Sequence, residues 1–445
     1  MENNIIVSDF LDNEYKDYAM YTIEQRAIPN LCDSFKTINR KVIYTGLKTV
    51  RSSSNKVSTL AGNVIVHAKY HHGNVSCEDA IVTMAQDFKN NLPLFDRIGQ
   101  FGSLRAPFAS ASRYISVKLS KNFDLIYRDH DLLEYVIDEN EQIQPMFYLG
   151  IIPMILINGG SGIAVSVASN ILNREPKNVI KECLSYLKNG KVGFLKPHVN
   201  DFTGTFTVDE ENHKKWYIKG HFKIENTSTV RVTELPPSVT YEKFEEILDN
   251  LMDKKTITNW DNQGKGKGII NYVVKFNREN LASMTEADIS KILKLTDQVT
   301  ENFTVLDENG KLKIFDSAQD ILKYFMDFRL TYYHKRKTFQ VTKLEKEIKN
   351  ISEKARFIKL VIDNKIQVSK KSKDEITAQL VKNKFEMIDD TYNHLLYIPI
   401  YNLSNEKYNE MLNQIESKNV EIDVIKKSDP KQTYITELEE LYKKL

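Results

Sequence analysis

The chain has 445 residues, of which 41% are hydrophobic and 27% charged, a balance typical of a soluble globular protein with about two to four domains. No apolar run approaches the roughly 20 residues that cross a bilayer, and the three cysteines lie too far apart to support a zinc site or a disulfide framework. The first residues lack the pattern of a signal peptide. Together these features argue against a membrane protein and a disulfide scaffold, and predict a cytoplasmic protein.

The net charge is only +2, but the positive charge is unevenly distributed along the chain. Residues 34–77 contain seven Lys or Arg and no acid, and residues 97–123 contain five more and no acid. Clustering of this kind indicates a nucleic-acid-binding surface. The alternative is a solvated basic face, but such faces usually carry interspersed Asp and Glu.

The first 150 residues are predicted to form short helices, and the residues after them a mixture of strands and helices. Helical spacing of apolar residues predicts helices over 15–24, 38–47 and 78–88, which are similar to helix-turn-helix modules. Alternation of apolar and polar residues then predicts an α+β region. Its expected elements are strands over 202–208, 216–224, 229–233 and 269–276, a helix over 241–251 and a turn-rich loop over 158–162.

From about residue 320 the pattern becomes helical. Apolar residues recur at alternating spacings of three and four, which predicts two long helices paired as an antiparallel coiled coil. Residues 363–403 between them are expected to form a small helical knob, and an ordinary helical bundle is the alternative. The positions expected in the seam are Leu344, Ile348, Ile351, Ala355, Ile358 and Ile362, followed by Tyr408, Leu412, Ile415 and Ile422.

The pair Arg113-Tyr114 lies inside the second acid-free segment. Tyrosine can form a covalent intermediate with a phosphorus centre, and a neighbouring guanidinium can bind phosphate oxygens with two hydrogen bonds. Tyr114 is therefore a candidate nucleophile aimed at a nucleic-acid backbone. The alternative is a packing role, which most of the 22 tyrosines are expected to have.

Six segments, in order along the chain, resemble the motifs of the type IIA DNA topoisomerases, and the likeness covers essentially the whole sequence. The segments are Arg26–Lys41, Tyr70–Gly73, Gln100–Ser103, Ala111–Tyr114, Ser161–Val165 and Thr233–Pro237. The sequence departs from the family's pattern at Ser34, Thr37, Asn74 and Ser116. It ends soon after the second predicted long helix, without the basic β-propeller of bacterial cleavage subunits. The chain therefore resembles the DNA-cleavage subunits of bacteriophage enzymes in this family.

The resemblance implies an α+β multidomain fold. A winged-helix DNA-cleavage domain is expected over 1–150 and an α/β tower domain over 151–325. A long antiparallel coiled coil is expected over 326–445, with the knob at 363–403 as a helical exit gate.

The resemblance also implies a mechanism. Tyr114 would form a transient 5′-phosphotyrosine link, with Arg113 stabilising the charge on the phosphate. The resulting double-strand break would let a second duplex pass, which gives relaxation and decatenation. Ile163 would insert between base pairs and bend the DNA. The residues expected to bind phosphate or DNA are Arg26, Lys36, Arg40, Lys41, Lys69, His71 and His72.

The implied partners are double-stranded DNA, a second copy of the chain joined through the winged-helix and exit-gate regions, and a large ATPase/toprim subunit, with no membrane. That subunit would bind Mg²⁺ and ATP, and no metal site is expected in this chain. A phage-encoded enzyme would act in the cytoplasm of the host cell. Two other functions stay open at this point: a non-catalytic architectural DNA-binding dimer, and a metal nuclease that uses Asp129 and Asp131.

Overall fold

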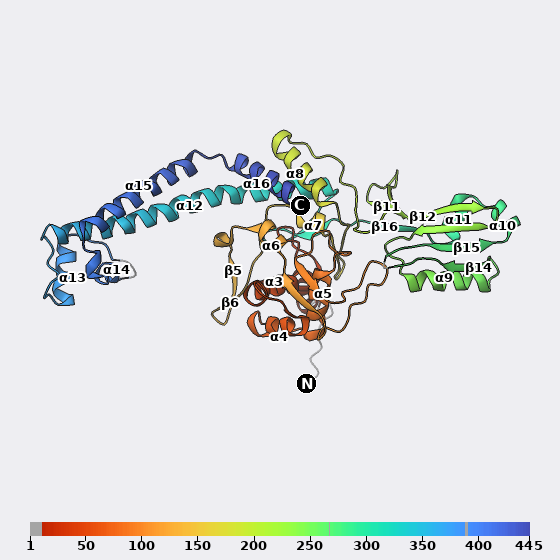
Figure 1. Ribbon diagram of the computed structural model, residues 1–445, viewed down its shortest axis with the longest axis horizontal. Coiled ribbons are helices and arrows are strands. Elements are labelled where there is room, and N and C mark those ends of the chain that lie inside the picture. Colours follow the sequence, from red (N-terminus) through yellow and green to blue (C-terminus); the bar gives the residue numbers. More distant parts are fainter. Residues whose placement is uncertain (1–10, 267, 388–389) are drawn as a thin grey trace. The chain divides into compact units, whose positions relative to one another are not determined.

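The computed structural model describes residues 11–266, 268–387 and 390–445, which form two compact units (Figure 1). The first unit contains the residues up to 329 together with 435–445, and the second contains 330–434. The expectation that the chain begins without a signal peptide falls on residues outside the described ranges. Within those ranges, no helix combines the length and the apolar character needed to cross a membrane.

Three helices and a small antiparallel sheet form the N-terminal part of the first unit. The helices share a core with the sheet, which has the strand order β1-β3-β2 and includes the fully buried Val42, Leu60, Ile81 and Val117. The elements are α3 (Thr37–Thr49), α4 (Val57–His67), α5 (Asn74–Ala85), β1 (Asn55–Lys56), β2 (Phe95–Ile98) and β3 (Ser116–Leu119). Two of these helices confirm predictions, with α5 displaced by about one turn. Helix α4 was not predicted because its valines and isoleucine are weak helix formers.

The chain enters this part through a helical segment that is largely exposed. Helix α2 (Lys16–Thr22) is flanked by the π-helical turns η1 (Leu11–Tyr15) and η2 (Ile23–Ala27), and η1 and α2 contain no buried residue. Only Ile23 and Ala27 of η2 enter the core. The predicted helix over 15–24 is therefore present, but most of its side chains are available for contacts at the surface.

The middle of the first unit consists of hairpins and short helices. Hairpin β8–β9 occupies part of the segment expected to be a loop, because Gly160 already belongs to β8. Gly162 permits its close packing, since a Cβ at that position would lie 1.8 Å from the carbonyl oxygen of Ala27. The elements are β4 (Tyr127–Arg128), β5 (Tyr135–Asp138), β6 (Glu141–Pro145), β7 (Leu149–Gly150), β8 (Gly160–Ile163), β9 (Ala168–Ile171), α6 (Lys121–Ile126), α7 (Met154–Ile157) and α8 (Pro176–Asn189).

Two antiparallel sheets complete the first unit. The larger has the order β12-β13-β15-β14 and packs its apolar residues against α9, α10 and α11 (Figure 1). The strand predicted over 216–224 is two strands separated at Gly220, where a Cβ would lie 2.2 Å from the Glu234 carbonyl oxygen. The larger sheet and its helices are β12 (His221–Asn226), β13 (Thr229–Glu234), β14 (Ile257–Asn262), β15 (Tyr272–Phe276), α9 (Tyr241–Asp253), α10 (Arg278–Ala282) and α11 (Glu286–Ile292). The others are β10 (Thr205–Val208), β11 (Lys215–Lys219), β16 (Thr296–Thr300) and the hairpin β17 (Thr304–Leu306)–β18 (Leu312–Ile314).

The second unit is helical. Helix α12 (Ala318–Ile362), from Leu330 onward, runs antiparallel to α15 (Asn405–Lys427), and ion pairs join Glu345 to Lys426 and Glu347 to Lys418. Ala355, Ile358 and Ile422 are buried as the heptad pattern predicts, but Leu412 is 42% exposed. Its neighbour Met411 packs on the knob core instead, because the helix there faces the knob. The remaining elements are α13 (Lys373–Lys382), α14 (Asn393–Leu396), η4 (Ile400–Asn402) and α16 (Pro430–Lys444). The residues of α16 from Ile435 onward belong to the first unit.

Candidate functional site

The turn that carries Tyr114 is held rigidly while its phenol ring points to solvent. The Tyr114 side chain is 66% exposed, but the next residue, Ile115, is buried. The Tyr114 amide donates to the Ala111 carbonyl at 2.8 Å, and the Val57 amide at the start of α4 donates to the Ile115 carbonyl at 3.1 Å. The Lys56 ammonium donates to the Tyr114 carbonyl at 3.2 Å. The backbone is therefore fixed on both sides of an accessible hydroxyl.

The surroundings of the Tyr114 ring are positively charged. The guanidinium carbon of Arg113 lies 4.8 Å from the centre of the ring. The N-terminus of α4, where helical N–H groups concentrate partial positive charge, begins at Val57 beside the same turn. The turn therefore carries two cations: Arg113, over the Tyr114 ring, and Lys56, at the Tyr114 carbonyl.

Other predicted site residues line a large groove in the first unit. The groove has a volume of about 1070 Å³, and Arg26, Lys36 and His72 are among its lining residues. Amides and hydroxyls supply much of the remaining lining, which includes Gln25, Asn39, Asn90, Ser161, Asn170 and Asn173. Arg113 and Tyr114 are not among the described residues that line it. Five of the predicted site residues thus fall into two groups, with Arg113 and Tyr114 at the tyrosine turn and Arg26, Lys36 and His72 along the groove. The other five, which are not among the described residues that line the groove, are Arg40, Lys41, Lys69, His71 and Ile163.

His72 is bound through both of its ring nitrogens. Its Nδ1 lies 3.2 Å from Nη2 of Arg26, and its Nε2 lies 2.9 Å from the hydroxyl of Tyr21. The ring of Tyr70 packs edge-on against it, with centroids 5.4 Å apart. Burial, followed by the nearby charges of Arg26, His71 and Lys41, lowers the pKa of His72, which favours the neutral ring. Tyr21 was not predicted as a site residue.

Lys36 lies next to the hairpin that carries Ile163. Its Nζ is 3.4 Å from where a Cβ on Gly162 would be, and burial lowers the pKa of Lys36. Ile163, the following residue, is 88% exposed, as a side chain that enters DNA would need to be. The fold therefore brings the Lys36 ammonium to the hairpin that carries the exposed Ile163, although the two residues are more than a hundred positions apart in the sequence.

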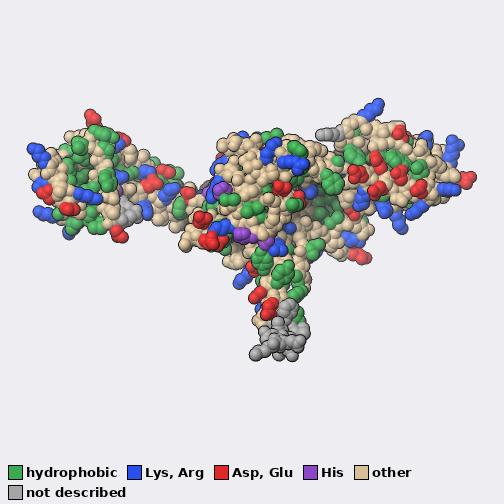
Figure 2. Space-filling model, turned by 90° about the horizontal axis from the view of Figure 1, so that it is seen from below, with side chains coloured by type: hydrophobic (Ala, Val, Ile, Leu, Met, Phe, Trp, Pro, Cys, Tyr) green, Lys and Arg blue, Asp and Glu red, His purple; other side chains and the backbone are tan. Residues whose placement is uncertain are grey.

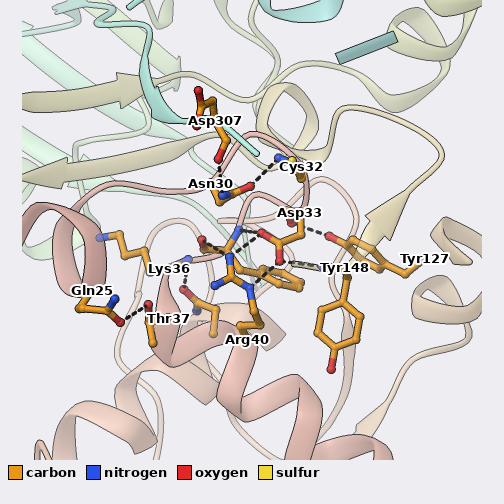
Figure 3. A network of polar contacts seen from close by, with 12 residues as sticks. Gln25, Asn30, Cys32, Asp33, Lys36, Thr37, Arg40, Tyr127, Tyr148 and Asp307 are labelled. Atoms are coloured by element: carbon orange, nitrogen blue, oxygen red, sulfur yellow. Dashed lines mark hydrogen bonds and ion pairs between the residues drawn. The ribbon is translucent and has the colours of Figure 1, made fainter. Parts of the chain in front are cut away.

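Arg40 is engaged in the interior (Figure 3). Its Nε donates to Asp33 Oδ2 at 2.8 Å and its Nη2 to Asp33 Oδ1 at 3.1 Å, and both side chains are buried. The same carboxylate accepts from the amide of Tyr148, and the hydroxyl of Tyr127 donates to the Asp33 carbonyl. Burial alone would lower the pKa of Arg40, but the charge and the hydrogen bonds of Asp33, with smaller contributions from Cys32 and Tyr148, together outweigh it and raise the pKa. This geometry favours a role in holding the segment before α3, and the expected DNA contact of Arg40 stays a prediction.

Two further predicted DNA-binding lysines have acceptors inside the chain. The buried Lys41 donates to the Ala68 carbonyl. Lys69 pairs with Glu139 at 2.6 Å and Asp138 at 3.8 Å, and the hydrogen bond to Glu139 raises the pKa of Lys69. His71, by contrast, has an exposed side chain. Figure 2 shows histidines at the surface beside both acidic and basic side chains. The expected roles of these residues stay predictions.

Asp129 and Asp131 are the acids that could suggest a metal site. Among the described residues, no group of three or more His, Cys, Asp or Glu is arranged to hold an ion. Asp129 is paired with the buried Arg329, with Oδ2 and Nη2 2.5 Å apart. The nuclease alternative therefore has one of its two carboxylates, that of Asp129, engaged in an ion pair within the chain.

Comparisons with known proteins agree on one family. The family model for the DNA gyrase/topoisomerase IV A subunit matches residues 26–441. The chain is 35% identical over 447 residues to the DNA topoisomerase medium subunit of Enterobacteria phage T4, covering 99% of both chains. It is 30% identical to the mitochondrial DNA topoisomerase 2 of Dictyostelium discoideum, covering 98% of this chain and 35% of that protein.

A solved structure is also similar. The DNA-binding, cleavage and re-ligation domain of Plasmodium falciparum topoisomerase II superposes with a TM-score of 0.85 at 30% sequence identity. The match covers 98% of this chain and 64% of that chain. The chain thus spans nearly the whole of the phage relative, but only about a third of the Dictyostelium protein.

Proposed function

Because the chain belongs to the family of DNA gyrase/topoisomerase IV A subunits, we propose that it is the DNA-cleavage and religation subunit of an ATP-dependent type IIA topoisomerase. The observation that carries this proposal is the Arg113-Tyr114 turn, in which an exposed phenol lies under a guanidinium on a fixed backbone. Strand passage through the transient break would relax and decatenate DNA.

In the proposed reaction the Tyr114 Oη attacks a backbone phosphorus in line. A bond forms between Oη and phosphorus, the bond from phosphorus to the 3′-oxygen breaks, the phenol loses its proton, and the departing 3′-oxygen gains one. Arg113 donates hydrogen bonds to the phosphate oxygens as charge develops on them. The 5′-phosphotyrosine link retains the energy of the broken bond, so the reverse reaction reseals the strand.

The groove would hold the DNA backbone on either side of the break. Arg26 and Lys36 are among the cations that line it, with His72 beside Arg26 and with Lys69 and His71 on the same segment as His72. We assign Arg40 and Lys41 mainly to holding that backbone-binding surface, on the basis of their internal acceptors. Ile163 would unstack a base step and bend the duplex toward the groove.

The fold is consistent with separate domains for DNA cleavage, the tower and the exit gate along the chain. Helices α3 to α5 with sheet β1-β3-β2 would form the winged-helix domain within 1–150, and the β12–β15 sheet the core of the tower within 151–325. Helices α12 and α15 would form the coiled coil, and the knob at 363–403 the exit gate. The knob exposes Tyr397, Ile400 and Tyr401 at 74–85%, an apolar surface suited to a second copy of the chain.

Mg²⁺ and ATP would be bound by a partner subunit with ATPase and toprim regions. The phage T4 relative is named a medium subunit, which is consistent with a multi-subunit enzyme. The same relative is consistent with action in the cytoplasm of a host cell.

A denaturant-trapped cleavage assay tests the proposal. The chain, its ATPase/toprim partner, Mg²⁺ and plasmid are mixed and stopped with detergent, and DNA ends are probed for linked protein. We expect protein at 5′ ends, lost in Tyr114→Phe and retained in Tyr18→Phe, a control at another exposed tyrosine. Duplex binding without any adduct, alongside an active partner, would instead support the architectural dimer. Free 5′-phosphate ends would support a nuclease.

A further inference from the structure

Tyr21, on helix α2, contacts both His72 and Arg26 at the edge of the groove. Its hydroxyl lies 2.9 Å from His72 Nε2, and the guanidinium carbon of Arg26 lies 5.4 Å from the centre of its ring. The rings of Tyr21 and His72 meet edge to face, with centroids 6.4 Å apart. Residues separated by up to 51 positions in the sequence therefore meet through Tyr21.

The hydrogen-bond pattern fixes the tautomer of His72. The Arg26 guanidinium can only donate, so His72 Nδ1 must accept from it. The proton of a neutral ring then resides on Nε2, which donates to the Tyr21 oxygen. A second ring proton would point at the Arg26 cation, which is the physical reason for the lowered pKa of His72 beyond its burial.

The rest of the cluster keeps His72 in this orientation. The Ser76 hydroxyl donates to the His72 carbonyl at 3.0 Å and lies 3.2 Å from the Tyr70 hydroxyl. The titratable or charged groups around His72 are thus Tyr21, Arg26, Lys41, Tyr70 and His71. Two of the five, Arg26 and Lys41, are cations, and the groove beside them also has one acid, Asp79, among its described lining residues.

Packing in the hydrophobic core does not account for the position of the Tyr21 side chain. Helix α2 has no buried residue, and the Tyr21 side chain is 40% exposed. Its hydrogen bond to His72 and its contact with Arg26 therefore contribute to holding it in place. By contrast Tyr18, one turn earlier on the same helix, is 57% exposed and offers a matched control.

We infer that Tyr21 is a positioning residue for the phosphate-binding groove. Its hydroxyl holds the His72 ring, its ring face packs on the Arg26 guanidinium, and together they aim Arg26 at a backbone phosphate of bound duplex DNA. The inference rests on the proposed function for the identity of the ligand, but the Tyr21–His72–Arg26 arrangement is a property of the chain itself.

The test has two arms. The first uses the purified chain labelled with ¹⁵N-histidine, in which the His72 signals are assigned by their loss in His72→Ala. We expect the Nε2–H tautomer in the wild type, a shifted and faster-exchanging Nε2 proton in Tyr21→Phe, and no change in Tyr18→Phe. An unchanged His72 spectrum in Tyr21→Phe would overturn the inference.

The second arm measures single-turnover formation of the covalent adduct by the holoenzyme at saturating duplex. Loss of one hydrogen bond predicts a rate about three- to tenfold lower in Tyr21→Phe, and a lower one still in Tyr21→Leu, which also loses the ring. In a His72→Ala background, Tyr21→Phe should add nothing, since it acts through His72. Additive losses would overturn the inference. An absence of adduct in the wild type would instead refute the proposed function, and the spectra would still decide the role of Tyr21.

Discussion

Arg105 and Glu234 form a buried ion pair, 2.6 Å between Nη2 and Oε1, that joins the loop before Tyr114 to the end of strand β13. Arg105 also donates to the carbonyls of Pro236 at 2.6 Å and Val239 at 3.0 Å, and Glu234 accepts from the amide and hydroxyl of Thr203. Both charged groups thus have several hydrogen-bond partners in addition to each other. The tyrosine-bearing loop is thereby anchored to the region proposed as the tower.

Removing one partner of this pair should be costly. We expect Arg105→Ala to lower the free energy of unfolding by about 3–5 kcal/mol, because it leaves the Glu234 carboxylate buried without its cation. The partly exposed pair of Arg231 with Glu225 provides the control, and Arg231→Ala should cost clearly less than Arg105→Ala through the loss of its ion pair. Urea denaturation followed by circular dichroism measures both. Equal losses in the two variants would contradict the prediction.

Arg26 and Arg40 should differ in how they affect DNA binding. Arg26→Ala should reduce the slope of log affinity against log salt by about 0.9, the value for one lost phosphate contact. Arg40→Ala should leave that slope unchanged but destabilise the fold, because Arg40 is paired with the buried Asp33. Titration of a labelled duplex at several salt concentrations, with thermal melts of each variant, separates the two effects. A reduced slope for an Arg40→Ala variant that folds normally would instead indicate that Arg40 contacts a phosphate.

Ile163 should control DNA bending more than DNA binding. In Ile163→Ala the apolar group that would unstack a base step is lost, so the bent state should be disfavoured by up to a few kcal/mol. Energy transfer between dyes at the two ends of a duplex reports the bend in the holoenzyme. Ile224→Ala, at an exposed isoleucine of β12, is the control and should behave as wild type. A normal bend in Ile163→Ala would remove the proposed role.

The stability of the chain should fall as pH drops from about 7.5 to 5.5. The pKa values of His72, His130 and His394 are all lowered in the fold, mainly by burial. Below the ordinary histidine pKa of about 6.5, the unfolded chain therefore takes up protons first, and unfolding becomes easier. Carboxylates such as Glu375, with a pKa of about 2, lose their charge only at lower pH.

Urea midpoints at several pH values measure this dependence. His130→Gln should flatten it, because the His130 ring, which stacks on Phe123, can no longer take up a proton on unfolding. The exposed His213→Gln should not change it. Stability that rose on acidification would contradict the prediction.

The sequence was most informative where one residue pattern determines one element. The heptad spacing predicted the buried Ala355 and Ile358 of α12, and the motif around Tyr114 predicted a candidate nucleophile that the fold leaves exposed. The distribution of charge along the sequence was less informative for Arg40. Asp33 lies just before the acid-free segment 34–77, so the charge count of that segment did not include the buried carboxylate that pairs with Arg40. Tyr21 carried no signal at all, since its partner His72 is 51 residues away and only the fold brings them together.

The close approach of Gly162 to the Ala27 carbonyl has a consequence for where bound DNA would bend. Ile163 follows Gly162 directly, and Arg26 precedes Ala27, so one backbone contact sets the spacing between the two side chains. In the proposed enzyme, the number of base pairs between the kinked step and the held phosphate would therefore be set by the protein and not by the DNA sequence. Any side chain larger than hydrogen at position 162 would increase the spacing between Ile163 and Arg26. The duplex would then bend at a different place relative to the phosphate held by Arg26.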